Sequence, residues 1–146
     1  MKWITRKNIK VDRVACPWLI CRFVDPRAEF LFVNEDQLVE AARAEHAIPF
    51  DAPRNPEVKL NHRGDMCSFE AIIADYDLKA PGLQRLALIV RAADVKGQEF
   101  VAAEGMGLRA IAEGFAAMQL SDEERLARGF PIYDALYEYA LHLGEG

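Results

Sequence analysis

The sequence predicts an α+β fold in which a small N-terminal sheet packs against a predominantly helical C-terminal layer. The first observation is that three short runs before residue 51 are rich in aromatic and branched side chains, as strands are. The second is that apolar residues after residue 67 recur at helical spacing. The length of 146 residues fits a single domain, 1–146, with a buried core.

Three strands are expected in the first third of the chain. The first is a short apolar segment, which we expect at an edge of the sheet. The second contains Phe30, Phe32 and Val33 and has the composition of a strand. The third contains Pro49, which cannot donate a backbone hydrogen bond and therefore predicts an edge position. These segments cover residues 3–5, 29–33 and 47–50.

Two helices are expected between these strands. Pro17 suits the first position of a helix, where a backbone N–H would have no partner in any case. Pro26 ends that helix, because the residue before a proline avoids helical angles. Asn34 and Gln37 resemble a capping box, which predicts a second helix directly after the second strand.

The second half of the chain is expected to be helical. A long loop over residues 51–64 precedes it, and loops of this length in compact domains are often functional. Ser121 and Glu124 form a capping box that opens a later helical run. Gly129 and Pro131 are expected to break that run, so that a last helix starts near Pro131. The earlier helices are expected over residues 67–76, 81–94 and 108–118.

The composition excludes several classes of protein. Hydrophobic residues make up 51% and charged residues 28%, which is typical of globular proteins. A net charge of −5 argues against nucleic-acid or anionic-membrane binding, although the amino end is locally basic. No apolar run of about 18 residues and no signal segment is present, so we expect a cytoplasmic protein without a membrane span. The three cysteines do not suggest a disulfide framework and are expected to be reduced thiols.

The densest group of metal-binding or proton-transferring side chains comprises His62, Asp65, Cys67 and Glu70. If a helix starts at Cys67, Cys67 and Glu70 share a face, and His62 approaches from the loop. Such donors would bind zinc if Cys67 takes part, or manganese or iron if only His62 and carboxylates do. One alternative is a loop–helix junction capped by Asp65 with Cys67 buried, and another is a metal-free acid/base or thiol site.

Two segments together resemble a known family. They are residues 12–26, DRVACPWLICRFVDP, and residues 62–70, HRGDMCSFE, and the later residues 133–137, YDALY, fit the same pattern. The chain resembles the C-terminal domain of bacterial chromate-resistance regulatory proteins, which also occurs in standalone small proteins. The resemblance spans nearly the whole chain and implies a function linked to chromate, but no particular reaction. Cys21 departs from the pattern, because an arginine is expected there.

The residues that match the pattern of this family include most of the candidate site. They are Arg13, Cys16, Pro17, Trp18, Arg22, Asp25, His62, Gly64, Asp65, Cys67, Phe69, Glu70, Asp94, Tyr133 and Asp134.

Arg13, Arg22 and Arg63 are the candidate anion-binding residues. A guanidinium group matches an oxyanion with two parallel hydrogen bonds, so these side chains could clamp chromate or a similar ion. The alternative is that Arg13 and Arg22 pair with Asp12, Asp25 or Glu29. Trp18 is expected to pack in the core.

Four further residues are secondary candidates for the site. Cys16 could act as a thiol, although a place near the start of a helix is the simpler interpretation. Asp94 could supply an additional ligand to the metal. Tyr133 and Asp134 lie on the last predicted helix and could reach the site or form structural hydrogen bonds.

These observations lead to one functional hypothesis and two alternatives. We expect a cytoplasmic sensor or accessory domain of the chromate-stress response that binds a divalent metal ion or a small oxyanion. The first alternative is a metal-dependent or thiol enzyme that acts on a small substrate. The second is a protein-interaction module without a site, which should expose an apolar patch. A homo-oligomer is compatible with all three.

Overall fold

The computed structural model describes residues 1–144 and confirms the α+β class. Its sheet contains three parallel strands in the order β2-β1-β3. The strands are β1 (Lys2–Arg6), β2 (Glu29–Val33) and β3 (Ile48–Pro49). In the register of the sheet, Ile4 pairs with Leu31 of β2 and with Pro49 of β3.

The position of β1 corrects one expectation, because residues 3–5 form the central strand and not an edge. All three of these residues are buried, which a strand with neighbours on both sides and cover on both faces requires. The edge position predicted for the strand that contains Pro49 is confirmed.

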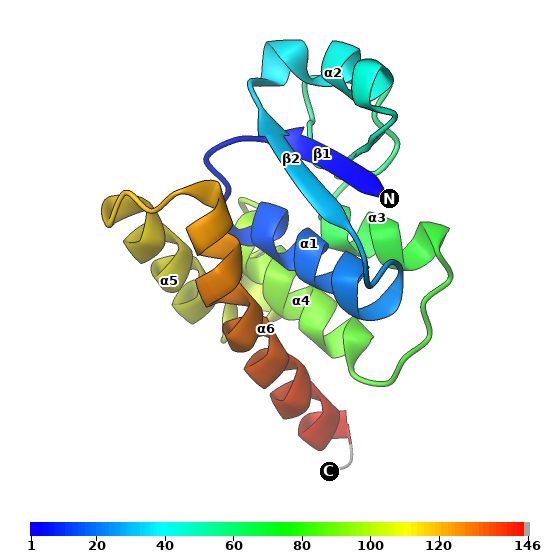
Figure 1. Ribbon diagram of the computed structural model, residues 1–146. Helices are drawn as coiled ribbons and strands as arrows, with labels where there is room; N and C mark the ends of the chain where they lie inside the picture. The colour runs from blue at the N-terminus through cyan, green and yellow to red at the C-terminus, as the bar shows by residue number, and fades with distance from the viewer. Residues whose placement is uncertain (145–146) are drawn as a thin grey trace.

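The sheet lies between α2 (Leu38–Glu45) and the main helical layer (Figure 1). On the α2 side, Ile4 packs with Ala42 and Ala47 in a small cluster. On the other side, Trp3 joins the main core, which also receives side chains from the remaining helices. Those helices are α1 (Val11–Phe23), α3 (Ser68–Asp75), α4 (Leu83–Asp94), α5 (Gly105–Ala117) and α6 (Asp122–Gly144).

Three predicted boundaries were wrong, and packing explains two of them. Helix α1 begins at Val11 and contains Pro17 in its interior, because residues 14–20 are all buried and tertiary packing outweighs local propensity. Helix α6 runs through Gly129 and Pro131. A Cβ atom on Gly129 would lie 2.6 Å from Cγ1 of Val14, so glycine permits close packing of α6 on α1.

The third wrong boundary is the predicted capping box at Asn34. Its side chain caps nothing there, and a short 3₁₀ turn over Glu35–Gln37 precedes α2. The capping box at the start of α6 is confirmed. The backbone N–H of Glu124 donates to Oγ of Ser121 at 3.1 Å, and the backbone N–H of Ser121 donates to Oε1 of Glu124 at 3.4 Å.

Trp18 packs at the centre of the helical layer, as expected from the sequence. Its ring stacks on Phe69 at a centroid distance of 6.5 Å and packs against Tyr133 and Tyr137. Its indole N–H donates to Oδ1 of Asp134 at 2.7 Å, which satisfies the polar atom of a side chain that is otherwise buried. These contacts tie α1 to α3 and α6.

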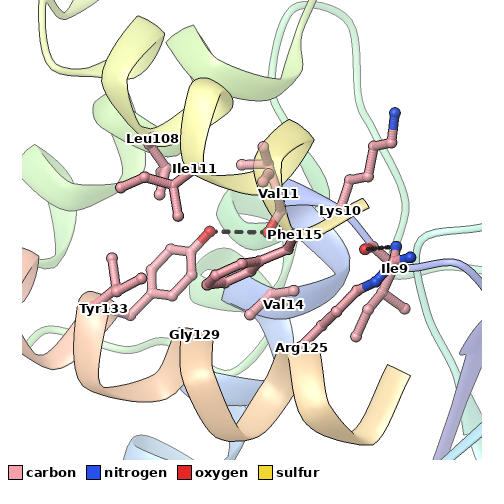
Figure 2. Close-up of a pocket in the computed structure, with 12 residues that line it drawn as sticks. Ile9, Lys10, Val11, Val14, Leu108, Ile111, Phe115, Arg125, Gly129 and Tyr133 are labelled. Carbon is pink, nitrogen blue, oxygen red and sulfur yellow. Dashed lines mark hydrogen bonds between the residues drawn. The ribbon is translucent and has the colours of Figure 1, made fainter. Parts of the chain in front are cut away.

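A small apolar cavity remains between α1, α5 and α6 (Figure 2). It is lined by residues such as Val14, Leu108 and Phe115, with Arg125 at one end. Its volume of about 20 Å³ is room for roughly one water molecule. The cavity is therefore a packing gap and not a ligand site.

Candidate functional site

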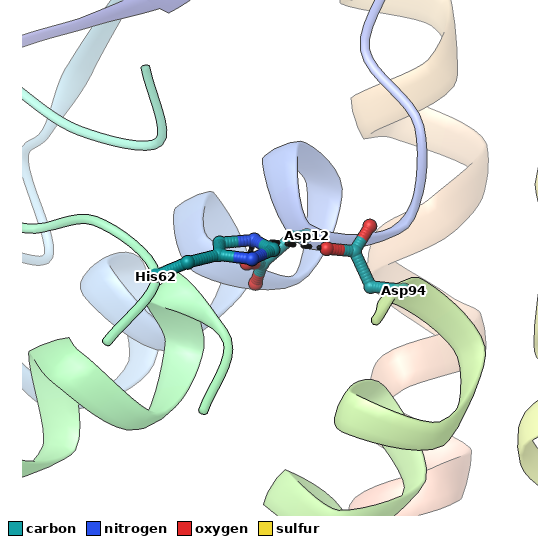
Figure 3. Close-up of side chains that lie close together, drawn as sticks. All are labelled: Asp12, His62 and Asp94. Carbon is teal, nitrogen blue, oxygen red and sulfur yellow. Dashed lines mark ion pairs between the residues drawn. The ribbon is translucent and has the colours of Figure 1, made fainter. Parts of the chain in front are cut away.

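The candidate site is centred on the imidazole of His62, which three aspartates surround. Its Nε2 atom lies 3.3 Å from Oδ2 of Asp12, 3.4 Å from Oδ1 of Asp51 and 3.1 Å from Oδ2 of Asp94. One possible ligand atom from each of Asp12, His62 and Asp94 lies within 4.8 Å of the other two. Figure 3 shows His62 reaching from its loop toward α1 and the end of α4.

The four side chains come from segments that are far apart in the sequence. Asp12 lies in the first turn of α1, and Asp94 is the last residue of α4. Asp51 follows β3, and His62 lies in the loop before α3. Asn61 anchors this loop, because its side chain accepts the N–H of Ala52 at 2.7 Å and donates to the carbonyl of the same residue at 2.9 Å.

Asp12 also holds the beginning of α3. Its Oδ2 accepts the backbone N–H of Ser68 at 2.7 Å, and its Oδ1 accepts that of Phe69 at 3.1 Å. The first N–H groups of a helix have no partner within the helix, and a carboxylate there also interacts favourably with the helix dipole. Asp12 is 1% exposed, so these bonds compensate for part of the cost of burying it.

Asp51 is the second buried carboxylate of the site. Its Oδ1 accepts a hydrogen bond from the hydroxyl of Ser68 at 2.8 Å. Its Oδ2 lies 3.5 Å from a terminal nitrogen of Arg6 and 3.4 Å from Nε of Arg13. The two guanidinium groups therefore balance a charge that His62 contacts from the opposite oxygen.

The surroundings of these groups shift their pKa values. Hydrogen bonds to Asp12, Asp51 and Asp94 raise the pKa of His62 to about 12. Burial raises the pKa of Asp12 to about 7 against the opposing hydrogen bond from His62. Burial also acts to raise the pKa of Asp51, but the hydrogen bonds from His62 and Ser68 outweigh it and leave that pKa below its usual value. The site thus concentrates negative charge around one positive imidazolium.

Comparison with known proteins places the chain in a family. The C-terminal domain of ChrB matches residues 3–140. The chain belongs to the ChrB C-terminal domain family. One relative is Protein ChrB of Cupriavidus metallidurans, 34% identical over 139 residues. The match covers 94% of this chain but 40% of that relative, so the chain spans about two fifths of its length. No solved structure matches the chain.

This membership confirms the chromate-resistance family that the sequence motifs indicated. Among the helices of residues 1–144, none combines the length and the apolar character that a membrane span requires. That finding agrees with the absence of a span expected from the sequence.

The ligand set predicted for a metal is only partly brought together in this ChrB-family domain. His62 joins the group described above, whereas Glu70 pairs with Arg91, whose Nε donates to Oε1 of Glu70 at 2.9 Å. Oε1 of Glu70 also accepts the backbone N–H of Cys67 at 3.0 Å and its thiol at 3.3 Å. Cys67 and Glu70 thus form the capping box of α3, while Asp65 is exposed.

The alternative of a loop–helix junction was right about burial but wrong about the cap. Cys67 is buried as that interpretation required, but Cys67 itself and not Asp65 is the N-cap residue. Burial raises the pKa of the Cys67 thiol far above its usual value, so the neutral thiol is the stable form. Cys16, Cys21 and Cys67 are all free, as predicted.

The three arginines proposed as an anion clamp each contact a carboxylate. Arg22 donates two hydrogen bonds at 3.0 Å to Asp134, and Arg63 donates two at 2.8 and 2.7 Å to Asp75. Arg13 approaches Asp51 and donates to the backbone carbonyls of residues 6 and 7. Arg13 and Arg22 thus pair with carboxylates, as the alternative from the sequence held, but its partners were wrong. The partners are Asp51 and Asp134, which are distant in the chain.

The secondary candidates divide between the site and the scaffold. Asp94 lies in the site, and the thiol of Cys16 donates to Oδ1 of Asp12 at 3.3 Å. Tyr133 is buried and donates to the carbonyl of Val11 at 3.0 Å, just before Asp12. Asp134, on α6, accepts hydrogen bonds from Trp18 and Arg22 of α1 and so connects the two helices. It lies outside the His62 cluster.

Sequence reasoning missed Asp12 and Asp51 as site residues. A signal was present for both of them. Asp12 is the first residue of the longer family motif, and Asp51 directly follows the third predicted strand. Polar side chains at the carboxyl ends of parallel strands frequently line ligand sites.

Proposed function

We propose that this domain binds a divalent metal ion through Asp12, His62 and Asp94, with Asp51 beside them, and that binding serves the chromate-resistance response of its family. The observation that carries the proposal is the convergence of three carboxylates on Nε2 of His62 within 3.1–3.4 Å. A cation in this position would replace the proton of the imidazolium and would be attracted by the same three charges.

The donor atoms favour particular metals. Carboxylate oxygens with one imidazole nitrogen suit manganese, iron or zinc, whereas a soft metal such as copper(I) prefers thiolates. Cys67 and Cys16 are buried thiols whose pKa values burial raises, so they add little to the donor set. Asp12 is already oriented by the two α3 amides, and such outer hydrogen bonds fix the ligands of known metal sites.

The same geometry favours a cation over an oxyanion. Three carboxyl groups surround His62, and an anion at that point would meet repulsion from those that are ionised. The three candidate arginines already form ion pairs with Asp51, Asp75 and Asp134. Binding of an oxyanion directly at this cluster would therefore require a metal ion to be present first.

A sensor or accessory role is the primary proposal, because the family membership connects the chain with chromate resistance. A metal-dependent enzyme is the second candidate. His62 and Asp94 are 28% and 21% exposed, so a metal held by them would be open to solvent on one side. A site with three protein ligands and an open position can hold a reactive water, as in catalytic zinc enzymes.

The direct test measures metal binding with matched variants. Untagged protein is titrated with Mn²⁺ and Zn²⁺ by calorimetry, and bound metal is quantified by elemental analysis. We expect one ion per chain for the wild type and a loss of at least tenfold in affinity for His62→Asn. The control is His46→Asn, since His46 is exposed and has a left-handed backbone conformation that asparagine tolerates.

A second pair of variants separates the site from nonspecific acidic binding. Asp94→Asn should weaken the metal as His62→Asn does, while Asp65→Asn should not, because Asp65 is exposed and outside the cluster. Equal affinity in all variants, or no binding in a wild type whose fold is confirmed by circular dichroism, would refute the proposal. Catalysis would be the better description if metal-loaded protein hydrolysed a model ester and Asp94→Asn did not.

A further inference from the structure

Helix α5 presents an outer face that is entirely apolar. The buried contacts of this helix come mainly from Gly105 and Leu108, while Met106, Ile111 and Met118 are 41%, 41% and 56% exposed. The face spans an arc of about 140° at 100° per residue. All of its members are exposed: Met106, Gly107, Ala110, Ile111, Gly114, Ala117 and Met118.

Such a face is unusual for a helix at the periphery of a protein. A surface helix normally places charged or polar residues opposite its buried side. In Figure 1, α5 lies at the outer edge of the helical layer, with α4 and α6 on its inner side. Phe100, in the 3₁₀ turn (Glu99–Val101) that precedes α5, is also largely exposed. Contiguous apolar surface of this kind marks an interaction site.

We infer that this face binds the same face of a second copy of the chain, with the two α5 helices antiparallel. The proposal goes beyond metal binding and does not depend on it. A two-fold axis between Ala110 and Ile111 would place Gly107 level with Gly114 of the second copy. Ile111 would then lie level with the second copy's Ala110. The level glycines lie near the middle of the face and allow the two backbones to approach closely.

The charges beside the outer face support an antiparallel pair of identical chains. Arg109 and Glu113 are the exposed charged residues of α5, and both lie on the same flank of the face. The two-fold axis brings Arg109 level with the second copy's Glu113 to within one residue, and symmetry forms this pair twice. Nζ of Lys10 lies 3.2 Å from Oε1 of Glu113 in the same chain. Arg109 has no ion pair or hydrogen bond within residues 1–144.

The test is the oligomeric state of the full chain. Sedimentation equilibrium over a range of concentrations should show a monomer–dimer equilibrium for the wild type. Ala110→Asp places a charge at the centre of the face without touching the core and should weaken dimerisation at least tenfold. The control is Ala135→Asp, at an exposed position in the middle of α6, which should leave the dissociation constant unchanged.

Charge reversal and crosslinking test the orientation. Arg109→Glu should weaken the dimer, and adding Glu113→Arg should restore most of the loss. Ala110→Cys should form a disulfide between two chains on mild oxidation, and Ala135→Cys should not. A wild type that stays monomeric at every concentration would overturn the proposal. So would a dimer that Ala110→Asp and Ala135→Asp affect equally.

Discussion

Replacing Arg91 with methionine removes the partner of a buried carboxylate and should destabilise the fold without affecting metal binding. Glu70 is 8% exposed, and its two oxygens accept separate hydrogen bonds from the guanidinium of Arg91. Breaking a buried ion pair by removing one partner typically costs about 3–5 kcal/mol. Arg91 is 20% exposed, so water can partly replace it, and we expect about 3 kcal/mol. For a chain of this length, that corresponds to a fall of roughly 10 °C in melting temperature.

Glu70→Gln probes the same pair from the other side. Glutamine retains an acceptor for the N–H of Cys67 but directs an NH₂ group at Arg91, so we expect a loss of about 2 kcal/mol. Because both variants remove one interaction, the double variant should cost roughly 1–2 kcal/mol less than the sum of the single effects.

The assay is urea unfolding followed by circular dichroism, combined with Zn²⁺ titration of each folded variant. We expect unchanged metal stoichiometry in Glu70→Gln and Arg91→Met, because Glu70 is committed to Arg91 and to the cap of α3. Additive effects of the two substitutions would show that the pair is not coupled. Loss of metal from folded Glu70→Gln protein would show that Glu70 is a ligand. The assignment of Asp12 and Asp94 as the carboxylate ligands would then be wrong.

Three further predictions concern other parts of the molecule. Iodoacetamide should label half-buried Cys21 first and the other two cysteines only after unfolding, as mass spectrometry can show. Gly105→Ala should cost about 1–3 kcal/mol in urea unfolding, since its Cβ would lie 2.5 Å from the nearest α4 side chain. The hydrogen bond from Arg22 lowers the pKa of Asp134, so its stabilisation is full above pH 4 and disappears as pH falls through the lowered pKa. Wild type and Arg22→Met should therefore differ by at most about 1 kcal/mol at pH 7, because the pair is largely exposed, and should converge once the pH falls below the lowered pKa of Asp134.

The fold class was predictable because its signals are local. Strand composition at residues 29–33 and helical spacing in residues 83–94 depend on neighbouring residues, and both elements are confirmed. β1 is the central strand because β2 and β3 lie on either side of it. No local pattern in the sequence indicates which strands will be neighbours. The continuous course of α6 across Pro131 likewise depends on packing against α1, which outweighs the usual effect of a proline.

The candidate site was only half predictable for a similar reason. His62 was identified because it lies in a cluster of chemically active residues, and Asp94 was named as a further ligand. Asp12 and Asp51 reach His62 only because α1 and β3 pack beside its loop. Glu70 is close to His62 in the sequence, but helix geometry turns it toward Arg91. Spacing along the chain could not distinguish these cases.

The hydrogen bonds from Asp12 to the first amides of α3 give the cluster a mechanical connection to the rest of the molecule. The carboxylate that faces His62 is the same group that fixes where α3 starts. Any ligand that draws Asp12 toward itself competes with those amides for the same oxygen atoms. If the cluster binds a metal ion, a change in its occupancy would therefore shift the first turn of α3, and the buried side chains of Ser68–Ile73 would pass that shift to the core around them.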